Sequence, residues 1–161
     1  MKFISSLAIR TMVLLLSSMV AAIALNHIRN DRLPWLGEWK RHVESRALQS
    51  GLKLVGIGTV RQALENNTTR LLDARPSADF RTGHMPHAIS LPLEFAADLL
   101  STMQIELLRE QPIITYCARQ DCDEGLELAL FLYRAGYTNV TLFAGGLNEW
   151  RTAGGAVEVG P

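Results

Sequence analysis

The sequence has few cysteines and no excess of charge of either sign. Its 161 residues include two cysteines, Cys117 and Cys122, which are too few for a disulfide framework. Their spacing does not match a zinc knuckle and no histidine pair completes a ligand set, so we expect neither a metal site nor a cofactor. The 16 basic and 16 acidic residues give a formal net charge of zero. No basic field favours nucleic acid, which is therefore not expected as a partner.

Long apolar runs are also rare, and the one present lies at the N-terminus. Thr11 to Leu25 contains no charged residue. A helix from Phe3 to Leu25 would be about 34 Å long, enough to cross a hydrocarbon core of ~30 Å. Arg10 interrupts the run, and its side chain can reach the near headgroups. Residues 1–25 are therefore predicted to form a single-pass membrane anchor.

A cleaved signal peptide is the alternative for this segment. Its apolar region has the same size, and Ala22-Ile23-Ala24 resembles a cleavage site. The orientation is open: counting Lys and Arg places the following chain in the cytoplasm, whereas a short, signal-like N-terminus favours export. We expect the domain to be extracytoplasmic.

Residues 26–50 are predicted to link the anchor to a domain at residues 51–161. Trp35, Trp39 and Val43 are four apart and share one face of a helix. This helix either lies at the membrane interface, with Lys40, Arg41 and Arg46 toward the headgroups, or packs on the domain.

The rest of the chain alternates between strand and helix patterns. Short apolar runs predict five strands: Lys53 to Ile57, Leu71-Leu72, Ala88 to Leu91, Ile113 to Tyr116 and Val140 to Phe143. Helical patterns begin at Thr59, Pro76, Ala96, Asp123 and Gly145, and the third runs to Leu107. This alternation predicts an α/β fold with a parallel sheet covered on both faces. Sites in such folds lie at the carboxyl ends of the strands.

Cys117 falls at such a strand end. It closes the apolar run Pro112 to Tyr116, and a helical pattern follows at Asp123. Loop N–H groups and a helix N-terminus at this junction favour a thiolate. The alternative is a small buried hydrophobic residue, which is the usual environment of a free cysteine.

Several motifs in series resemble the rhodanese-like (sulfurtransferase) domain family, from about Lys53 to about Val157. They are Asp73-Ala74-Arg75, Gly83-His84-Met85-Pro86-His87-Ala88, Tyr116-Cys117, Gly136-Tyr137-Thr138-Asn139-Val140 and Gly145-Gly146-Leu147-Asn148-Glu149-Trp150. The resemblance implies a three-layer α/β/α sandwich with a five-stranded parallel sheet. It also implies that Cys117 is catalytic: its thiolate takes sulfur from a small sulfane-sulfur donor, becomes a persulfide, and passes the sulfur to a thiol acceptor.

The active loop departs from the family's usual pattern. It comprises Ala118, Arg119, Gln120, Asp121, Cys122 and Asp123, with a second cysteine where the family has an arginine. Arg119 is its only cation, whereas Asp121, Asp123 and Glu124 are acidic. This acidic rim opposes a divalent donor, so polysulfide is predicted to be favoured over thiosulfate.

The supporting residues have alternative interpretations. Cys122 is a resolving thiol, a sulfur relay or a structural cysteine. Asp73 and Arg75 support the site or form a structural ion pair. His84 is expected to fix a turn by a hydrogen bond, and His87 replaces the family's glycine.

Two competing functions use the same cysteine. A phosphatase of the Cys-x5-Arg type is disfavoured because the sixth position after Cys117 is Asp123, which repels phosphate. A redox-sensing or non-enzymatic sulfur-binding module, switching the Cys117–Cys122 pair between dithiol and disulfide, remains the alternative.

Overall fold

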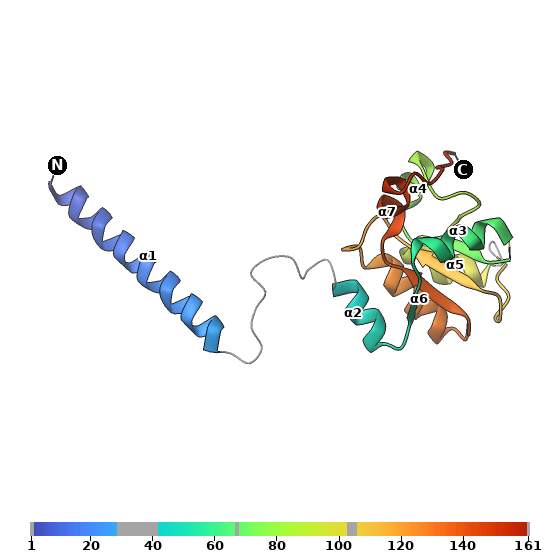
Figure 1. Cartoon of the computed structure of the whole chain (residues 1–161), viewed down its shortest axis with the longest axis horizontal. Helices are drawn as coiled ribbons and strands as arrows, with labels where there is room; N and C mark the ends of the chain where they lie inside the picture. Colours follow the sequence, from blue (N-terminus) through green and yellow to red (C-terminus); the bar gives the residue numbers. More distant parts are fainter. Residues whose placement is uncertain (1, 29–41, 67, 103–105, 161) are drawn as a thin grey trace. The chain divides into compact units, whose positions relative to one another are not determined.

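The computed structural model describes residues 2–28, 42–66, 68–102 and 106–160, with side chains from residue 8 onward. The chain divides into two compact units, Met1–Gly37 and Glu38–Pro161 (Figure 1). Trp35, Trp39, Lys40 and Arg41, on which the interfacial helix was predicted, lie outside the described residues.

The N-terminal unit contains one helix, α1 (Lys2–Ile28). Its segment Ala8–Ile28 is long and apolar enough to cross a membrane, a test that a signal sequence also passes. The hydroxyls of Thr11, Ser17 and Ser18 each donate to a carbonyl three residues earlier. Because these bonds satisfy the hydroxyls within the helix, the polar residues are compatible with an apolar surrounding.

The second unit is built on a parallel sheet of five strands in the order β1-β5-β4-β2-β3. The strands are β1 (Lys53–Leu54), β2 (Arg70–Asp73), β3 (Ile89–Ser90), β4 (Ile113–Tyr116) and β5 (Val140–Phe143). The predicted α/β fold with a five-stranded parallel sheet is confirmed. β4 lies at the centre and every one of its residues is buried, as expected for a strand covered on both faces.

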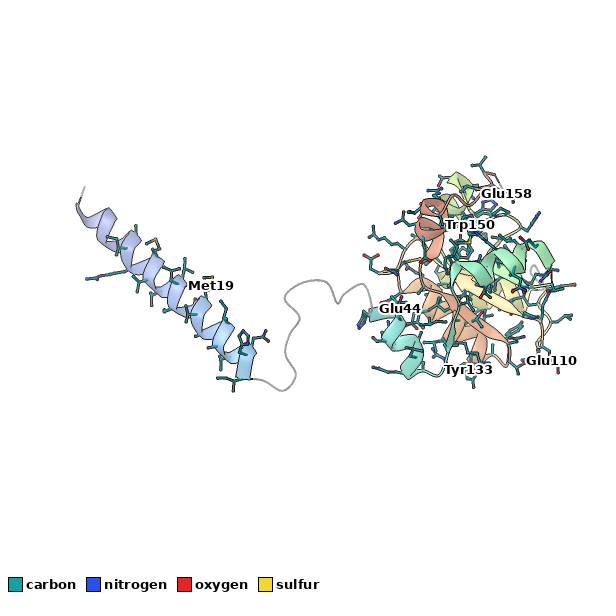
Figure 2. The ribbon with its side chains drawn as sticks, viewed as in Figure 1. Met19, Glu44, Glu110, Tyr133, Trp150 and Glu158 are labelled. Atoms are coloured by element: carbon teal, nitrogen blue, oxygen red, sulfur yellow. A yellow bond between two sulfur atoms is a disulfide. The ribbon has the colours of Figure 1, made fainter. Side chains whose placement is uncertain are left out.

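Helices form a layer on each side of this sheet (Figure 1). They are α2 (His42–Gln49), α3 (Ile57–Asn66), α4 (Ser77–Thr82), α5 (Ala96–Ser101), α6 (Glu124–Arg134) and α7 (Gly146–Thr152), with a 3-10 turn η2 (Leu93–Phe95) before α5. One core cluster joins α2, α5 and α6 to one face of the sheet, and the other joins α3 and α7 to the opposite face. Trp150 of α7 belongs to the second cluster (Figure 2).

Of the two positions proposed for the helix before the domain, α2 takes the one on the domain. Val43 and Ala47 are fully buried in the first core cluster. Arg46, predicted to face headgroups, instead forms ion pairs with Asp123 and Glu127 around the start of α6. The short helix is therefore an integral part of the folded unit.

Several element boundaries differ from the prediction, among them that of β1, which ends at Leu54 rather than Ile57. α3 begins at Ile57 rather than near Thr59, because Gly56 already accepts the first turn's hydrogen bonds from Thr59 and Val60. α5 ends at Ser101, short of the predicted Leu107. Leu107 still packs against the first core cluster from outside the helix, which explains why its spacing resembled that of a helix.

Candidate active site

Cys117 follows β4 directly and is almost fully buried, with 4% of its surface exposed. The start of α7 holds its backbone: Leu147 N–H donates to the Cys117 carbonyl and Asn148 N–H to the Ala118 carbonyl, each at 2.9 Å. Gly146 makes this approach possible. Its φ is +61°, and a Cβ there would lie 2.5 Å from the Cys117 carbonyl oxygen. The Gly-Gly pair before α7 therefore helps to build the site.

Cys117 forms a disulfide with Cys122, across a Cα–Cα distance of 6.1 Å. The intervening residues fold into a turn in which Cys122 N–H donates to the Arg119 carbonyl. This curled loop supplies the close approach that a disulfide needs. The structure thus brings together the two cysteines, which is the arrangement that a resolving thiol requires.

The carboxylate of Glu124 lies against both sulfurs. Its Oε2 is 2.7 Å from Cys122 Sγ and 3.4 Å from Cys117 Sγ. The neighbouring acids have cationic partners: Asp121 pairs with Arg119 at 2.6 Å, and Asp123 pairs with Arg46 at 3.2 Å. Glu124 has no such pair within the described part of the chain. The acidic rim predicted from the sequence is therefore partly neutralised, and its unpaired charge faces the sulfurs.

The loop also leaves backbone donors unused. The N–H groups of residues 118–121 donate to no protein acceptor among the described residues. Such N–H groups at a turn before a helix stabilise negative charge. The loop therefore offers backbone donors without a protein acceptor among the described residues, beside one carboxylate that opposes negative charge on the sulfurs.

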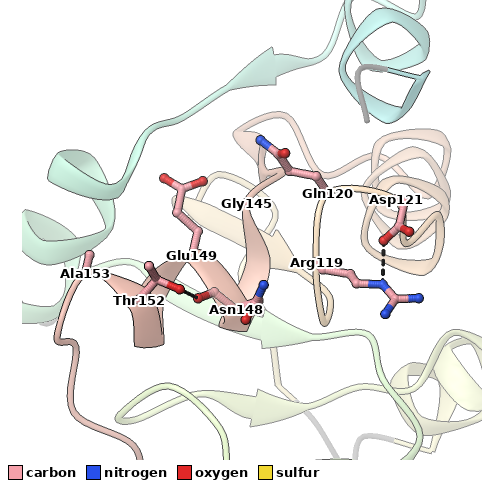
Figure 3. Close-up of a pocket in the computed structure, with 8 residues that line it drawn as sticks. All are labelled: Arg119, Gln120, Asp121, Gly145, Asn148, Glu149, Thr152 and Ala153. Atoms are coloured by element: carbon pink, nitrogen blue, oxygen red, sulfur yellow. Dashed lines mark hydrogen bonds and ion pairs between the residues drawn. The ribbon is translucent and has the colours of Figure 1, made fainter. Parts of the chain in front are cut away.

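A cavity of about 590 Å³ lies beside the loop (Figure 3). It is lined by loop and α7 residues: Arg119, Gln120, Asp121, Gly145, Asn148, Glu149, Thr152 and Ala153. Figure 3 shows Arg119 engaged with Asp121 and Thr152 with the Asn148 carbonyl. Among the charged side chains that line the cavity, the Glu149 carboxylate forms no ion pair within the described part of the chain. The cavity is therefore mildly acidic.

Asp73 and Arg75 form a buried ion pair at the end of β2, next to β4. Arg75 donates to both Asp73 oxygens and, through Nη2, to the Gly83 carbonyl at 2.8 Å. Burial opposes the Arg75 charge, but hydrogen bonding and attraction from Asp73 outweigh it and raise the pKa of Arg75. Burial, reinforced by Asp73, also raises the pKa of Tyr116. These contacts join β2 to the turn at Gly83, which agrees with the interpretation of Asp73 and Arg75 as a structural ion pair.

His84 and His87, the two histidines of the Gly83 turn, have structural roles. His84 Nδ1 is 2.9 Å from the Phe80 carbonyl, and its ring stacks on Phe80. His87 has φ of +57°, the left-handed region that favours glycine. This backbone conformation explains why the related motif has glycine where this chain has histidine.

The loop lies between β4 and α6, and sequence reasoning did not identify three of the residues that support it. Glu124 was counted as part of an acidic rim, although nothing in the sequence said that it faces the sulfurs. Arg46 lies 81 residues before its partner Glu127, too far for any local pattern. Gly146 carried a signal in the Gly-Gly pair, which was interpreted as a family motif and as the start of a helix but not as a contact of the loop.

A nearly buried cysteine at the carboxyl end of the central strand, in a loop before a helix, defines an α/β protein with a thiol-based site. The chain matches the rhodanese-like domain family over residues 57–153 and belongs to that family. The predicted family and fold are thereby confirmed.

Two curated proteins illustrate the similarity. The HTH-type transcriptional regulator Rv0324 of Mycobacterium tuberculosis is 32% identical over 96 residues, covering 60% of this chain and 40% of the regulator. Thiosulfate/3-mercaptopyruvate sulfurtransferase 2 of Arabidopsis thaliana is 29% identical over 120 residues, covering 62% of this chain and 35% of that protein. The chain thus spans two fifths or less of these relatives.

Solved structures agree with the fold. The crystal structure of the Alr3790 protein from Anabaena sp. superimposes with a TM-score of 0.58 at 25% identity. The match covers 65% of this chain and 80% of that one. A rhodanese-like domain with these relatives is consistent with sulfurtransferase activity in general.

Proposed function

We propose that this protein is a rhodanese-like sulfurtransferase in which Cys117 carries the transferred sulfur. The observation that supports this most directly is the position of Cys117 at the end of β4, followed by a loop whose N–H groups at 118–121 are unused. The reduced Cys117 thiolate attacks the sulfane sulfur of a donor and displaces the donor's remaining part. The unused N–H groups then stabilise the negative charge of the resulting persulfide.

The preferred donor is a polysulfide or hydropersulfide rather than thiosulfate. Thiosulfate carries two negative charges, and the unpaired Glu124 carboxylate lies 3.4 Å from the sulfur it must reach. Arg119 does not offset this repulsion because it is paired with Asp121. A singly protonated polysulfide or a hydropersulfide group carries less charge at the reacting sulfurs than thiosulfate and meets a smaller barrier.

The test uses full-length protein in detergent micelles, reduced with a phosphine that is then removed. The Cys122→Ser variant, treated with polysulfide, should gain one sulfur atom in its intact mass. The Cys117→Ser/Cys122→Ser double variant should gain none, and thiosulfate should load Cys122→Ser more slowly than polysulfide. Equal sulfur gain by the double variant would remove Cys117 from the mechanism.

We further propose that α1 anchors the protein in a membrane as a single span, with the domain on the extracytoplasmic side. The support is the length and apolar character of Ala8–Ile28. The full chain should stay with membranes through a carbonate wash, and externally added protease should reach the domain in intact cells. Recovery of protein with Met1 still present in the soluble fraction would contradict the anchor.

A redox-sensing module is the second candidate, favoured by the Cys117–Cys122 disulfide. In that case the pair would switch reversibly between dithiol and disulfide without taking up sulfur. The sulfur-loading experiment separates the two functions, because a sensor would gain no sulfur atom from the donor before any reductant is added and would pass no sulfur to an added thiol.

A further inference from the structure

The structure contains a second thiol that can end the reaction without an external acceptor. We infer that Cys122 attacks the Cys117 persulfide and releases the transferred sulfur as hydrosulfide, so that the chain reduces sulfane sulfur as well as transferring it. This inference rests on the proposed function, because it begins with the persulfide on Cys117. It assigns a reaction to Cys122 and a proton-transfer role to Glu124.

The geometry selects which sulfur is attacked. A persulfide on Cys117 has an inner sulfur, Sγ, and an outer sulfur received from the donor. The bond that the structure places in this loop joins Cys122 Sγ to Cys117 Sγ, the inner sulfur. Attack there expels the outer sulfur, whereas attack on the outer sulfur would only move it to Cys122.

The step balances in atoms and electrons. The Cys122 thiol and the Cys117 persulfide anion become the Cys117–Cys122 disulfide and HS⁻. The bond between the inner and outer sulfurs breaks and the bond between the two Sγ atoms forms. In this step the Cys122 sulfur is oxidised and the outer sulfur, which leaves with the electron pair of the broken bond, is reduced; over uptake and release together the dithiol becomes a disulfide. A dithiol reductant then restores both thiols and becomes a disulfide itself.

Glu124 is placed to carry the proton of this step. Its Oε2 is 2.7 Å from Cys122 Sγ, within reach of the thiol proton, and 3.4 Å from Cys117 Sγ, to which the departing sulfur is attached. The proton leaves Cys122 as its sulfur attacks and ends on the outgoing sulfide. Asp123 and Glu127 cannot substitute easily, because both are held by Arg46.

This reaction also explains why Glu124 is left unpaired beside a disulfide. A disulfide sulfur has no proton to donate, so the carboxylate gains no hydrogen bond from either sulfur in the oxidised state. It gains one when Cys122 is a thiol. The carboxylate therefore interacts best with the reduced form that begins the reaction.

The decisive experiment is a single turnover with full-length protein in detergent micelles, reduced and freed of reductant under anaerobic conditions. The donor is glutathione hydropersulfide with a labelled outer sulfur. The wild type should release about one equivalent of labelled sulfide per chain and lose both free thiols. Cys122→Ser should keep the label on Cys117 until an external thiol is added.

Two variants of matched charge test the proton-transfer role. Glu124→Gln should slow sulfide release about tenfold or more and change the pH dependence of the release rate. Glu124→Asp, which keeps a carboxylate, should slow the release less. Glu127→Gln removes the same charge one turn along α6 and should leave the release rate near that of wild type. Equal slowing in both variants would mean that only the overall field matters, and it would remove Glu124 from the reaction.

The outcomes separate this inference from the proposed function. A stable labelled persulfide in the wild type, with Cys122 still a free thiol and no sulfide released, overturns the reductive step and leaves sulfur transfer intact. Equal sulfide release by Cys122→Ser also overturns the role of Cys122. Failure of Cys122→Ser to take up any label overturns the proposed function and this inference together.

Discussion

Replacing Glu124 by glutamine should raise the rate of sulfur uptake from thiosulfate. The variant removes one negative charge 3.4 Å from Cys117 Sγ while keeping the size of the side chain. At that distance two unit charges repel by about 1.2 kcal/mol with the dielectric constant of water, and by about 5 kcal/mol at an effective dielectric of ~20. Glu124 is exposed to solvent, so the lower value applies.

An energy of about 1.2 kcal/mol corresponds to roughly an eightfold change in rate. The assay is sulfite release from thiosulfate in a single turnover of reduced protein, which reports only the first half-reaction. The gain should shrink as salt is added, because an exposed charge is screened. Glu127→Gln serves as the control, since its carboxylate already pairs with Arg46.

Asp123 is a poorer target for this experiment, although it belongs to the same acidic rim. The structure pairs Asp123 with Arg46 at 3.2 Å, so its removal would free a cation as well as delete an anion. If Glu124→Gln and Glu127→Gln gave equal gains, or if neither changed sulfite release, the assignment of the repulsion to Glu124 would be wrong.

Three further substitutions test the scaffold. Val43→Ala should lower the free energy of unfolding by about 2 kcal/mol in urea titrations, because Val43 is 2% exposed; an unchanged midpoint would mean that α2 does not belong to the domain. His87→Gly should stabilise the protein by about 0.5 kcal/mol, since φ is +57° there, and a loss of stability would contradict the strain argument. Gly146→Ala should cost about 2 kcal/mol or more and slow the reaction of Cys117 with a thiol reagent, because its Cβ would meet the Cys117 carbonyl; normal thiol reactivity would show that the α7 contact does not position the loop.

The sheet could be predicted because its strands are short, apolar and separated by helical patterns. Ile113 to Tyr116 was predicted with the bounds that the structure has, since a strand buried on both faces is apolar throughout. The helix at Ala96 was predicted too long, because Leu107 lies at helical spacing yet reaches the core from outside the helix. Periodicity identifies residues that face the core but does not fix where a helix ends.

The site could be predicted only as far as local sequence determines it. Cys117, Cys122 and the loop between them are contiguous, so their proximity follows from the chain itself. The pairing of Asp123 with Arg46 depends on how α2 packs against α6. That packing joins residues far apart in sequence, and no periodic pattern encodes it. A count of the charges in the loop therefore overestimated the acidic rim.

Glu124 links the two halves of the proposed reaction, and the two halves respond to its charge in opposite directions. During sulfur uptake the carboxylate repels an anionic donor and disfavours the Cys117 thiolate, so its removal should accelerate the step. During sulfide release the same oxygen, 2.7 Å from Cys122 Sγ, receives a proton that must move, so its removal should slow the step.

Glu124→Gln should therefore accumulate the persulfide, because sulfite release from thiosulfate becomes faster while sulfide release from the loaded enzyme becomes slower. A purely structural Glu124 would shift both rates in the same direction through loop disorder, and a purely electrostatic one would be mimicked by added salt. The persulfide that builds up in Glu124→Gln, and not in Glu127→Gln, distinguishes these cases.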